Sequence, residues 1–327
     1  MEKLIRKNAV LYKEMMRDMK RPKALIIMMV INLIIGIIVA GFFAYVAIGG
    51  AVFEKISNST FIIMFRVIII TEAAFITFMA PALTAGAVSL EKERQTLDVL
   101  LTTRMTPWEI IKGKYLSNVV FMSLLVLSTM PAMSFVFIYG GINILQMFAI
   151  VLCLLVLIMY ISSFGVFFSA ATKSTVASVI LTYIVMVIFM SLTFTIPFVV
   201  TIIGLIIEES VYDYVHYTLN NVTWPEHFLP YEYLYATLYL NPFVTLFDCM
   251  GTVLGFQIDG ESFNGMRGLV KEIHDNADIF VGPNNILVIL WTPISMVIQL
   301  LFSFLLLKLS AVCLNPIKGA KKKKKRK

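Results

Sequence analysis

The sequence predicts an all-α integral membrane protein with six transmembrane helices, and three observations carry this prediction. First, 59% of the 327 residues are hydrophobic and the mean hydropathy is +0.87, which is more apolar than an ordinary soluble domain. Second, six apolar stretches reach the roughly 20 residues that are needed to cross about 30 Å of hydrocarbon. Third, the basic residues gather in segments that a six-helix arrangement places on one side of the membrane.

The predicted spans are separated by polar segments. Several are longer than one crossing requires, which indicates tilt or a helical extension beyond the bilayer. We expect the spans at residues 24–50, 61–88, 115–139, 144–171, 176–207 and 284–313. They form a transmembrane domain of residues 24–313, which lies between an N-terminal segment, residues 1–23, and a basic tail, residues 314–327.

Lysine and arginine predict the orientation. Of the 27 basic residues, 8 lie in residues 1–23, 5 in 89–114, 1 in 172–175 and 9 in 308–327, so 23 lie on one side. Basic segments stay in the cytoplasm because their translocation is costly, and both termini are therefore expected to be cytoplasmic. The net charge of +7 follows from this asymmetry, so we expect contact with membrane lipids and no nucleic-acid partner.

Residues 3–21 have the pattern of an amphipathic helix that lies in the membrane interface. Their apolar residues fall near one helix face, and most of their basic residues favour the other. The alternative is a basic segment that is merely solvated.

The second span contains Glu72, which lies about 16 Å from the outer end of the span at 1.5 Å per residue. An ionisable side chain at this depth should face protein or a water-filled cavity, and it is a candidate functional residue. The alternative is a carboxyl group that is protonated or bonded to a neighbouring helix.

Small residues form stripes on two of the predicted spans. They are Gly36, Ala40 and Ala44 in the first span, and Ser162, Gly165 and Ser169 in the fourth. Such stripes allow two helix backbones to approach closely. Contact within one bundle and contact between two copies of the chain both fit this pattern.

Residues 208–283 form a predicted extracellular region, which holds 11 of the 20 acidic residues. Within it an apolar stretch, residues 233–256, is interrupted by Asn241, Pro242 and Asp248. A complete seventh span here would place the basic tail outside. We therefore predict a re-entrant or interfacial helical pair, because broken helices at membrane depth are tolerated where protein covers them.

The stretch EKERQTLDVLLTTRMTPWEIIKGK, residues 91–114, is rich in charge and lies between two spans. It predicts two short helices with a break at residues 102–105, and the first carries an apolar stripe of Leu90, Leu97, Leu100 and Leu101. The second begins with Thr106 as N-cap, and Glu109 completes a capping box. A simple connector would not need such well-formed helices, so we interpret the loop 89–114 as a docking surface for another protein.

Several catalytic motifs are absent from the sequence. It contains no G-x-x-x-x-G-K-[ST] phosphate loop, no H-E-x-x-H zinc motif and no G-x-S-x-G nucleophile motif. Its three cysteines are too few and too scattered for a disulfide framework or a metal site. We therefore expect no enzyme activity and no catalytic, cofactor-binding or metal-binding residues in this chain.

The pattern E-K-E-R-x-T-L-x-x-L-L, followed by T-P-W-E-I-I-x-G-K, resembles the loop between the second and third spans of type-2 ABC transporter permeases. Asn241-Pro242-Phe243 also resembles a recurrent element of the re-entrant region of that family. The chain has Gln95 where the family often has Gly, and Arg104 where it often has Pro.

The resemblance implies the permease subunit of an ATP-driven exporter in the plasma membrane of a prokaryotic cell. It implies an N-terminal elbow helix, six spans and a re-entrant pair before the last span. A cytosolic ATPase subunit would bind ATP and magnesium, and a second permease copy or a homologous permease would complete a dimer. The residues that would dock the ATPase are Glu91, Glu93, Arg94, Thr96, Leu97, Leu100, Leu101, Thr106 and Glu109.

Two other classes of function remain open at this point. A membrane scaffold, sensor or immunity component would keep the docking loop but move no solute. An intramembrane enzyme would need a cluster of polar side chains within the spans, and Glu72 alone does not form such a cluster. Nothing in the spans selects among drugs, peptides, glycans and ions as the substrate.

Overall fold

The computed structural model describes most of the predicted spans and the segments that join them. The described residues are 22–50, 58–97, 105–138, 142–218, 231–254, 256–258, 261–263 and 290–314, with Tyr12, Glu14, Met16 and Thr102 as isolated positions. Within this part of the chain, six helices are long and apolar enough to cross a membrane. The predicted all-α membrane fold with six candidate spans is therefore confirmed. Apart from Tyr12, Glu14, Met16 and Leu314, the predicted elbow helix and the basic tail lie outside the described residues, and both stay predictions.

Six long helices contain the candidate spans. They are α3 (Pro22–Gly50), α4 (Asn58–Thr84), α7 (Pro107–Ile138), α8 (Ile144–Ala171), α9 (Thr175–Thr218) and α14 (Trp291–Cys313). The fifth predicted span ended at residue 207, whereas α9 continues as helix to Thr218.

The shorter elements lie before α7 and between α9 and α14. They are α5 (Ser89–Glu93), the 3₁₀ helix η1 (Tyr231–Leu240), α10 (Pro242–Leu254) and the strands β1 (Phe256–Ile258) and β2 (Glu261–Phe263). The strands pair antiparallel, with Phe256 opposite Phe263. This small hairpin has no counterpart among the elements predicted from the sequence.

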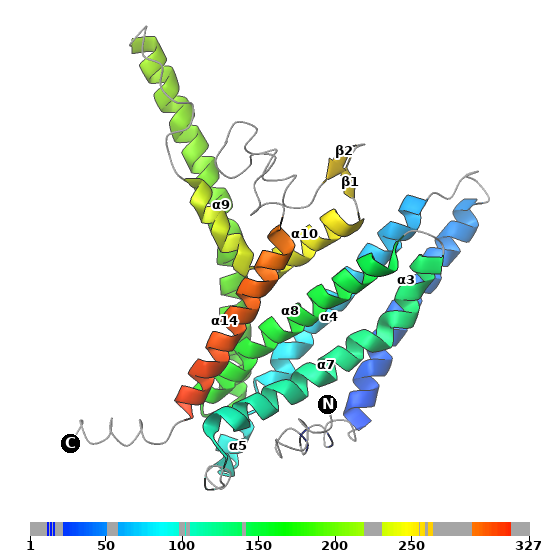
Figure 1. Cartoon of the computed structure of the whole chain (residues 1–327), viewed down its shortest axis with the longest axis vertical. Coiled ribbons are helices and arrows are strands. Elements are labelled where there is room, and N and C mark those ends of the chain that lie inside the picture. Colours follow the sequence, from blue (N-terminus) through cyan, green and yellow to red (C-terminus); the bar gives the residue numbers. More distant parts are fainter. Residues whose placement is uncertain are drawn as a thin grey trace. The chain divides into compact units, whose positions relative to one another are not determined.

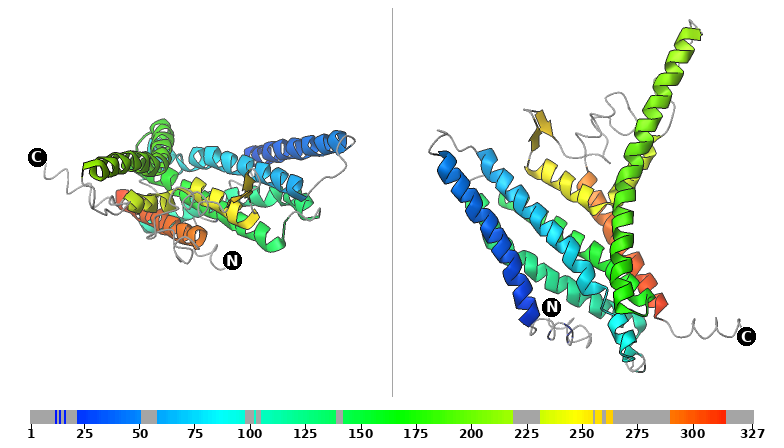
Figure 2. Two further views of the ribbon diagram at one scale, coloured as in Figure 1. Left: turned by 90° about the horizontal axis from the view of Figure 1, so that it is seen from above. Right: turned by 180° about the vertical axis from the view of Figure 1, so that it is seen from behind.

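The chain divides into two compact units, one of residues 1–184 and 300–327 and one of residues 185–299. In the first unit α4 packs against α7 and α8, and α3 packs against α4 and α7 (Figures 1 and 2). Large side chains from the facing sides of these helices are fully buried, among them Phe65, Ile68, Met122, Leu125 and Tyr160. The core of this unit therefore lies between the four helices α3, α4, α7 and α8.

Helices α4 and α8 approach each other closely at Gly165. A Cβ atom at this position would overlap Thr84 Oγ1 and would lie 2.8 Å from Thr84 Cβ and 3.2 Å from Ala85 N. Ser162 and Ser169, on the same stripe, are also buried. The small-residue stripe of the fourth span is therefore used inside the bundle.

The stripe of the first span has a different environment. Gly36, Ala40 and Ala44 are exposed, and a Cβ atom built at Gly36 would meet no described atom within 4 Å. This stripe is not covered by the described residues of the same chain.

In the second unit a cluster of buried residues joins η1, α10 and the start of α14. Leu238, Tyr239, Val244 and Trp291 form this cluster, and the rings of Tyr239 and Trp291 stack with centroids 3.9 Å apart. Asn241 separates η1 from α10, and Pro242 is the first residue of α10. The predicted helical pair with its break at Asn241 is present, and its re-entry into the membrane stays a prediction.

Candidate functional site

The segment of residues 88–97 joins α4 to the residues that precede α7, and its helix α5 is short. α5 ends at Glu93, and the next turn places Gln95 in the left-handed region with φ 57°. The Gln95 N–H donates to Lys92 O at 3.1 Å and the Thr96 N–H donates to Glu91 O at 2.9 Å. These two bonds are those of a Schellman motif, which closes the C-terminus of a helix.

The predicted first loop helix with a continuous leucine stripe was therefore wrong. The left-handed turn at Gln95 ends the helix, so Leu90 and Leu97 do not lie on one helix face. Leu90 is 39% exposed, whereas Leu97 is 7% exposed and thus buried within this chain. Leu100 and Leu101 lie outside the described residues.

Gln95 occupies a position that favours glycine, because a Cβ atom in the left-handed region costs about 1–2 kcal/mol. We expect Gln95→Gly to keep the turn and to slow amide hydrogen exchange at residues 95 and 96. The greater freedom of glycine in the unfolded chain offsets part of this gain, by about 0.5–1 kcal/mol. Gln95→Val should speed exchange at the same amides. Equal exchange in both variants would show that the turn does not limit local stability.

Ser169 of α8 holds the start of the 88–97 segment. Its hydroxyl oxygen accepts the N–H groups of Val88 at 2.8 Å and of Ser89 at 2.9 Å. These are backbone N–H groups at the start of α5, where a helix has no partner of its own for them. One serine thus fixes the direction in which the chain leaves α4.

Two charged side chains of α5 hold the turn between α8 and α9. Lys92 Nζ donates to Ala170 O and, at 3.0 Å, to Thr172 O, at the C-terminal end of α8. Glu93 Oε2 accepts from Thr175 Oγ1 at 2.6 Å, at the first residue of α9. Each charge has the sign that the adjacent helix end favours.

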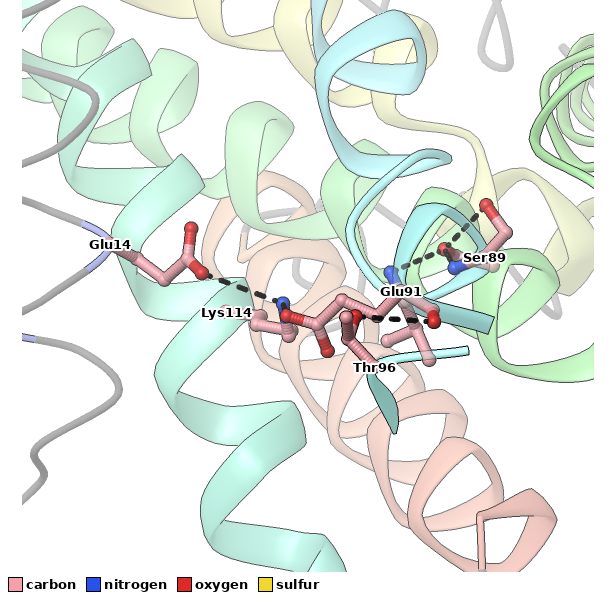
Figure 3. A network of polar contacts seen from close by, with 7 residues as sticks. Glu14, Ser89, Glu91, Thr96 and Lys114 are labelled. Atoms are coloured by element: carbon pink, nitrogen blue, oxygen red, sulfur yellow. Dashed lines mark hydrogen bonds and ion pairs between the residues drawn. The ribbon is translucent and has the colours of Figure 1, made fainter. Parts of the chain in front are cut away.

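Lys114 of α7 binds the 88–97 segment from the other side. Its Nζ lies 2.7 Å from Glu91 Oε1 and 3.6 Å from Glu14 Oε1, and its side chain is only 4% exposed. Figure 3 shows Lys114 between these two carboxylates, one from the segment that precedes α3 and one from α5. The three side chains bring together residues that lie far apart in the sequence.

The start of α7 has the predicted capping box. The Thr106 N–H donates to Glu109 Oε2 at 2.8 Å, and the Glu109 N–H donates to Thr106 Oγ1 at 3.3 Å. Pro107 is the first residue of the helix. α7 then continues without interruption to Ile138, so the predicted second loop helix is the first part of the third span.

The predicted docking residues divide into two groups. Arg94, Thr96, Thr106 and Glu109 are exposed, whereas the carboxylates of Glu91 and Glu93 hold other parts of this chain. Sequence reasoning missed Lys92, Lys114 and Ser169 as positioning residues. The available signal was Lys114 itself, a lysine two turns inside α7 that directly precedes the long apolar part of the helix, because such a cation needs a partner when it is buried.

Glu72 is fully buried between α4 and α7. Its Oε1 accepts from Thr129 Oγ1 at 2.8 Å, and its Oε2 makes no hydrogen bond with a described residue. The contact is the neighbouring-helix bond that the sequence analysis gave as an alternative. Among the described residues, no group of three or more His, Cys, Asp or Glu side chains is placed to hold a metal ion.

The buried polar residues near the break at Asn241 bind within the second unit. Asn241 Oδ1 caps α10 by accepting the Phe243 N–H at 3.0 Å, and its Nδ2 donates to Met190 O at 3.0 Å. Asp248 accepts a hydrogen bond from Thr292. These contacts fix α10 to α9 and to α14.

Comparison with known proteins identifies one family. No match is found among curated proteins. A family model described as ABC-2 type transporter matches residues 8–202, which is more than half of the chain and includes α3, α4, α5, α7, α8 and most of α9. Six of the described helices are also long and apolar enough to span a membrane. The chain therefore belongs to the ABC-2 type transporter family and is a membrane permease component of an ABC transporter.

Proposed function

We propose that this permease is the subunit that forms the export pathway, and that a cytosolic ATPase drives it through the 88–97 segment. The observation that carries the proposal is how this segment is held. It continues from α4 and contacts α7 through Glu91 and Lys114. It also contacts the end of α8 through Ser169 and Lys92 and the start of α9 through Glu93. A force on this one segment would therefore act on the ends of four helices together.

In this proposal the segment faces the cytoplasm, as do both chain termini, in the plasma membrane of a prokaryotic cell. The ATPase binds ATP and magnesium, and this chain supplies the docking surface. Arg94 and Thr96 are exposed beside the left-handed turn, so a partner can reach their side chains.

The complex also contains a second permease, either a copy of this chain or a homologue. The exposed stripe of Gly36, Ala40 and Ala44 on α3 supports this part of the proposal. Small residues let two helices pack closely in lipid, where apolar burial alone gives little drive to associate. The matching stripe on α8 is already occupied by α4, so it does not compete for this role.

The docking test uses Arg94→Glu. The side chain is exposed, so the variant should fold and melt as the wild type does. It should bind the co-purifying ATPase at least about tenfold more weakly, which corresponds to 1.4 kcal/mol. Lys112→Glu is the matched control, because Lys112 is also exposed but lies on α7 outside the segment. Unchanged ATPase binding by Arg94→Glu, measured by size-exclusion chromatography and titration, would contradict docking at this surface.

A scaffold, sensor or immunity component would dock the ATPase without moving solute. Inside-out vesicles that contain the complex should take up solutes from a cell extract when ATP is present, as measured by mass spectrometry. Vesicles with an ATPase unable to hydrolyse ATP are the control. Equal solute content in both, with the ATPase still bound, would favour the scaffold.

A further inference from the structure

Lys114 is a buried cation at which two separate segments of the chain meet. Its ammonium group is 2.7 Å from Glu91 of α5 and 3.6 Å from Glu14, which precedes α3. Glu14 is also buried. A charge taken out of water needs a compensating partner, and removal of one partner leaves the other uncompensated. The three groups therefore constrain one another's positions.

The Glu91 carboxylate depends on Lys114 for its placement. Glu91 Oε1 accepts the hydrogen bond from Lys114 Nζ, whereas Oε2 is buried and makes no hydrogen bond with a described residue. The Glu91 backbone oxygen is engaged separately, by the N–H of Thr96. Lys114 thus sets how the side of α5 that carries Glu91 lies against α7.

We propose that Lys114 is a positioning residue for coupling, which rests on the proposed function above. It holds the 88–97 segment and Glu14 to α7, so that a movement of either one reaches the third span. Lys114 itself is too buried to touch an ATPase. Its loss should therefore weaken the transmission of movement while the exposed docking residues remain in place.

The first experiment measures this arrangement in the purified full-length chain, without any partner. In Lys114→Met, which keeps the length of the side chain but removes its charge, peptides covering residues 88–97 and Glu14 should both exchange amide hydrogens faster. Lys114→Arg should restore slow exchange because it keeps the cation. Lys112→Met is the control, since Lys112 lies two residues away on the same helix and is exposed. Unchanged exchange in Lys114→Met at both peptides would overturn the proposal.

The second experiment measures coupling in the complex with the co-purifying ATPase. Lys114→Met should bind the ATPase within about twofold of the wild type, but the ATP turnover that the permease stimulates should fall about tenfold, within the usual range of coupling between sites. Lys114→Arg should recover most of this turnover. Wild-type turnover in Lys114→Met, with faster exchange confirmed, would remove the coupling role from Lys114.

Lys114→Met leaves the Glu91 carboxylate without the cation that it contacts, so the double variant Lys114→Met with Glu91→Gln is prepared in parallel. It removes the uncompensated charge of Glu91 and should fold even where the single variant does not. Its turnover should stay low, because the contact between α5 and α7 is still missing. High turnover in the double variant would show that only charge balance matters and would contradict a positioning role. Failure of the wild-type chain to bind any ATPase would refute the proposed function instead, and the exchange experiment would still stand alone.

Discussion

Gly165→Ala is expected to lower the thermal stability of the permease more than any other substitution that adds one methyl group to the first unit. The new Cβ atom would overlap Thr84 Oγ1 and would lie 3.2 Å from the backbone nitrogen of Ala85, so α4 and α8 would have to move apart. Overpacking of this kind costs about 1–3 kcal/mol, and a backbone atom cannot turn away as a flexible side chain can. The measurement is thermal unfolding in detergent.

The matched control is Gly41→Ala on α3, outside the stripe of Gly36, Ala40 and Ala44, where a Cβ atom meets no described atom within 4 Å. This substitution should be neutral or should stabilise the helix by up to about 1 kcal/mol, because alanine loses less conformational freedom than glycine. Adding Thr84→Ala to Gly165→Ala should recover only part of the loss, because the Thr84 Cβ atom, 2.8 Å away, remains. Equal melting temperatures for Gly165→Ala and Gly41→Ala would contradict close packing of α4 on α8.

Asn241→Leu is the second substitution with a large expected effect. It would remove the cap of α10 and the hydrogen bonds from Asn241 Nδ2 to Met190 O and Thr193 Oγ1, which are 3.0 Å and 3.1 Å long. A lost cap costs about 1 kcal/mol, and each of the two lost hydrogen bonds costs about 0.5–1.5 kcal/mol, because Thr193 Oγ1 still donates to Met190 O. We therefore expect a loss of about 2–4 kcal/mol in the second unit, seen as earlier unfolding of peptides from α10 in hydrogen exchange.

Two controls isolate the contribution of Asn241. Thr193→Ala removes one of the acceptors of Asn241 Nδ2 and leaves the cap, so its effect should be about 1 kcal/mol. Phe243→Ala changes an exposed neighbour and should alter α10 least. If Asn241→Leu exchanged no faster than Phe243→Ala, the break between η1 and α10 would be held by packing and not by Asn241.

The elements that depend on local sequence could be predicted. The six spans follow from length and composition, and the start of α7 follows from Thr106, Pro107 and Glu109, because a capping box uses residues within one turn. The break at Asn241 follows from the Asn-Pro pair for the same reason. Depth along a helix also revealed Glu72 as a buried carboxyl group.

The contacts between distant residues could not be predicted in this way. Nothing near Glu72 in the sequence indicates Thr129, and nothing near Lys114 indicates Glu14. The left-handed turn was missed because glutamine does not favour that conformation, and only the glycine common in the family at this position hinted at it. Stripes of small residues show that a helix can approach another closely, but not which helix it approaches.

The contacts between α5 and the α8–α9 turn limit which segments can be exchanged between related permeases in a chimera. Lys92 reaches the last carbonyls of α8, while the adjacent Glu93 reaches the first residue of α9. The turn of residues 172–174 must therefore be short, because the neighbouring side chains of Lys92 and Glu93 have to reach the end of α8 and the start of α9. A chimera that imports this turn from a relative should import residues 88–93 with it, since the two pieces, more than 75 residues apart in the chain, form a single transplantable part.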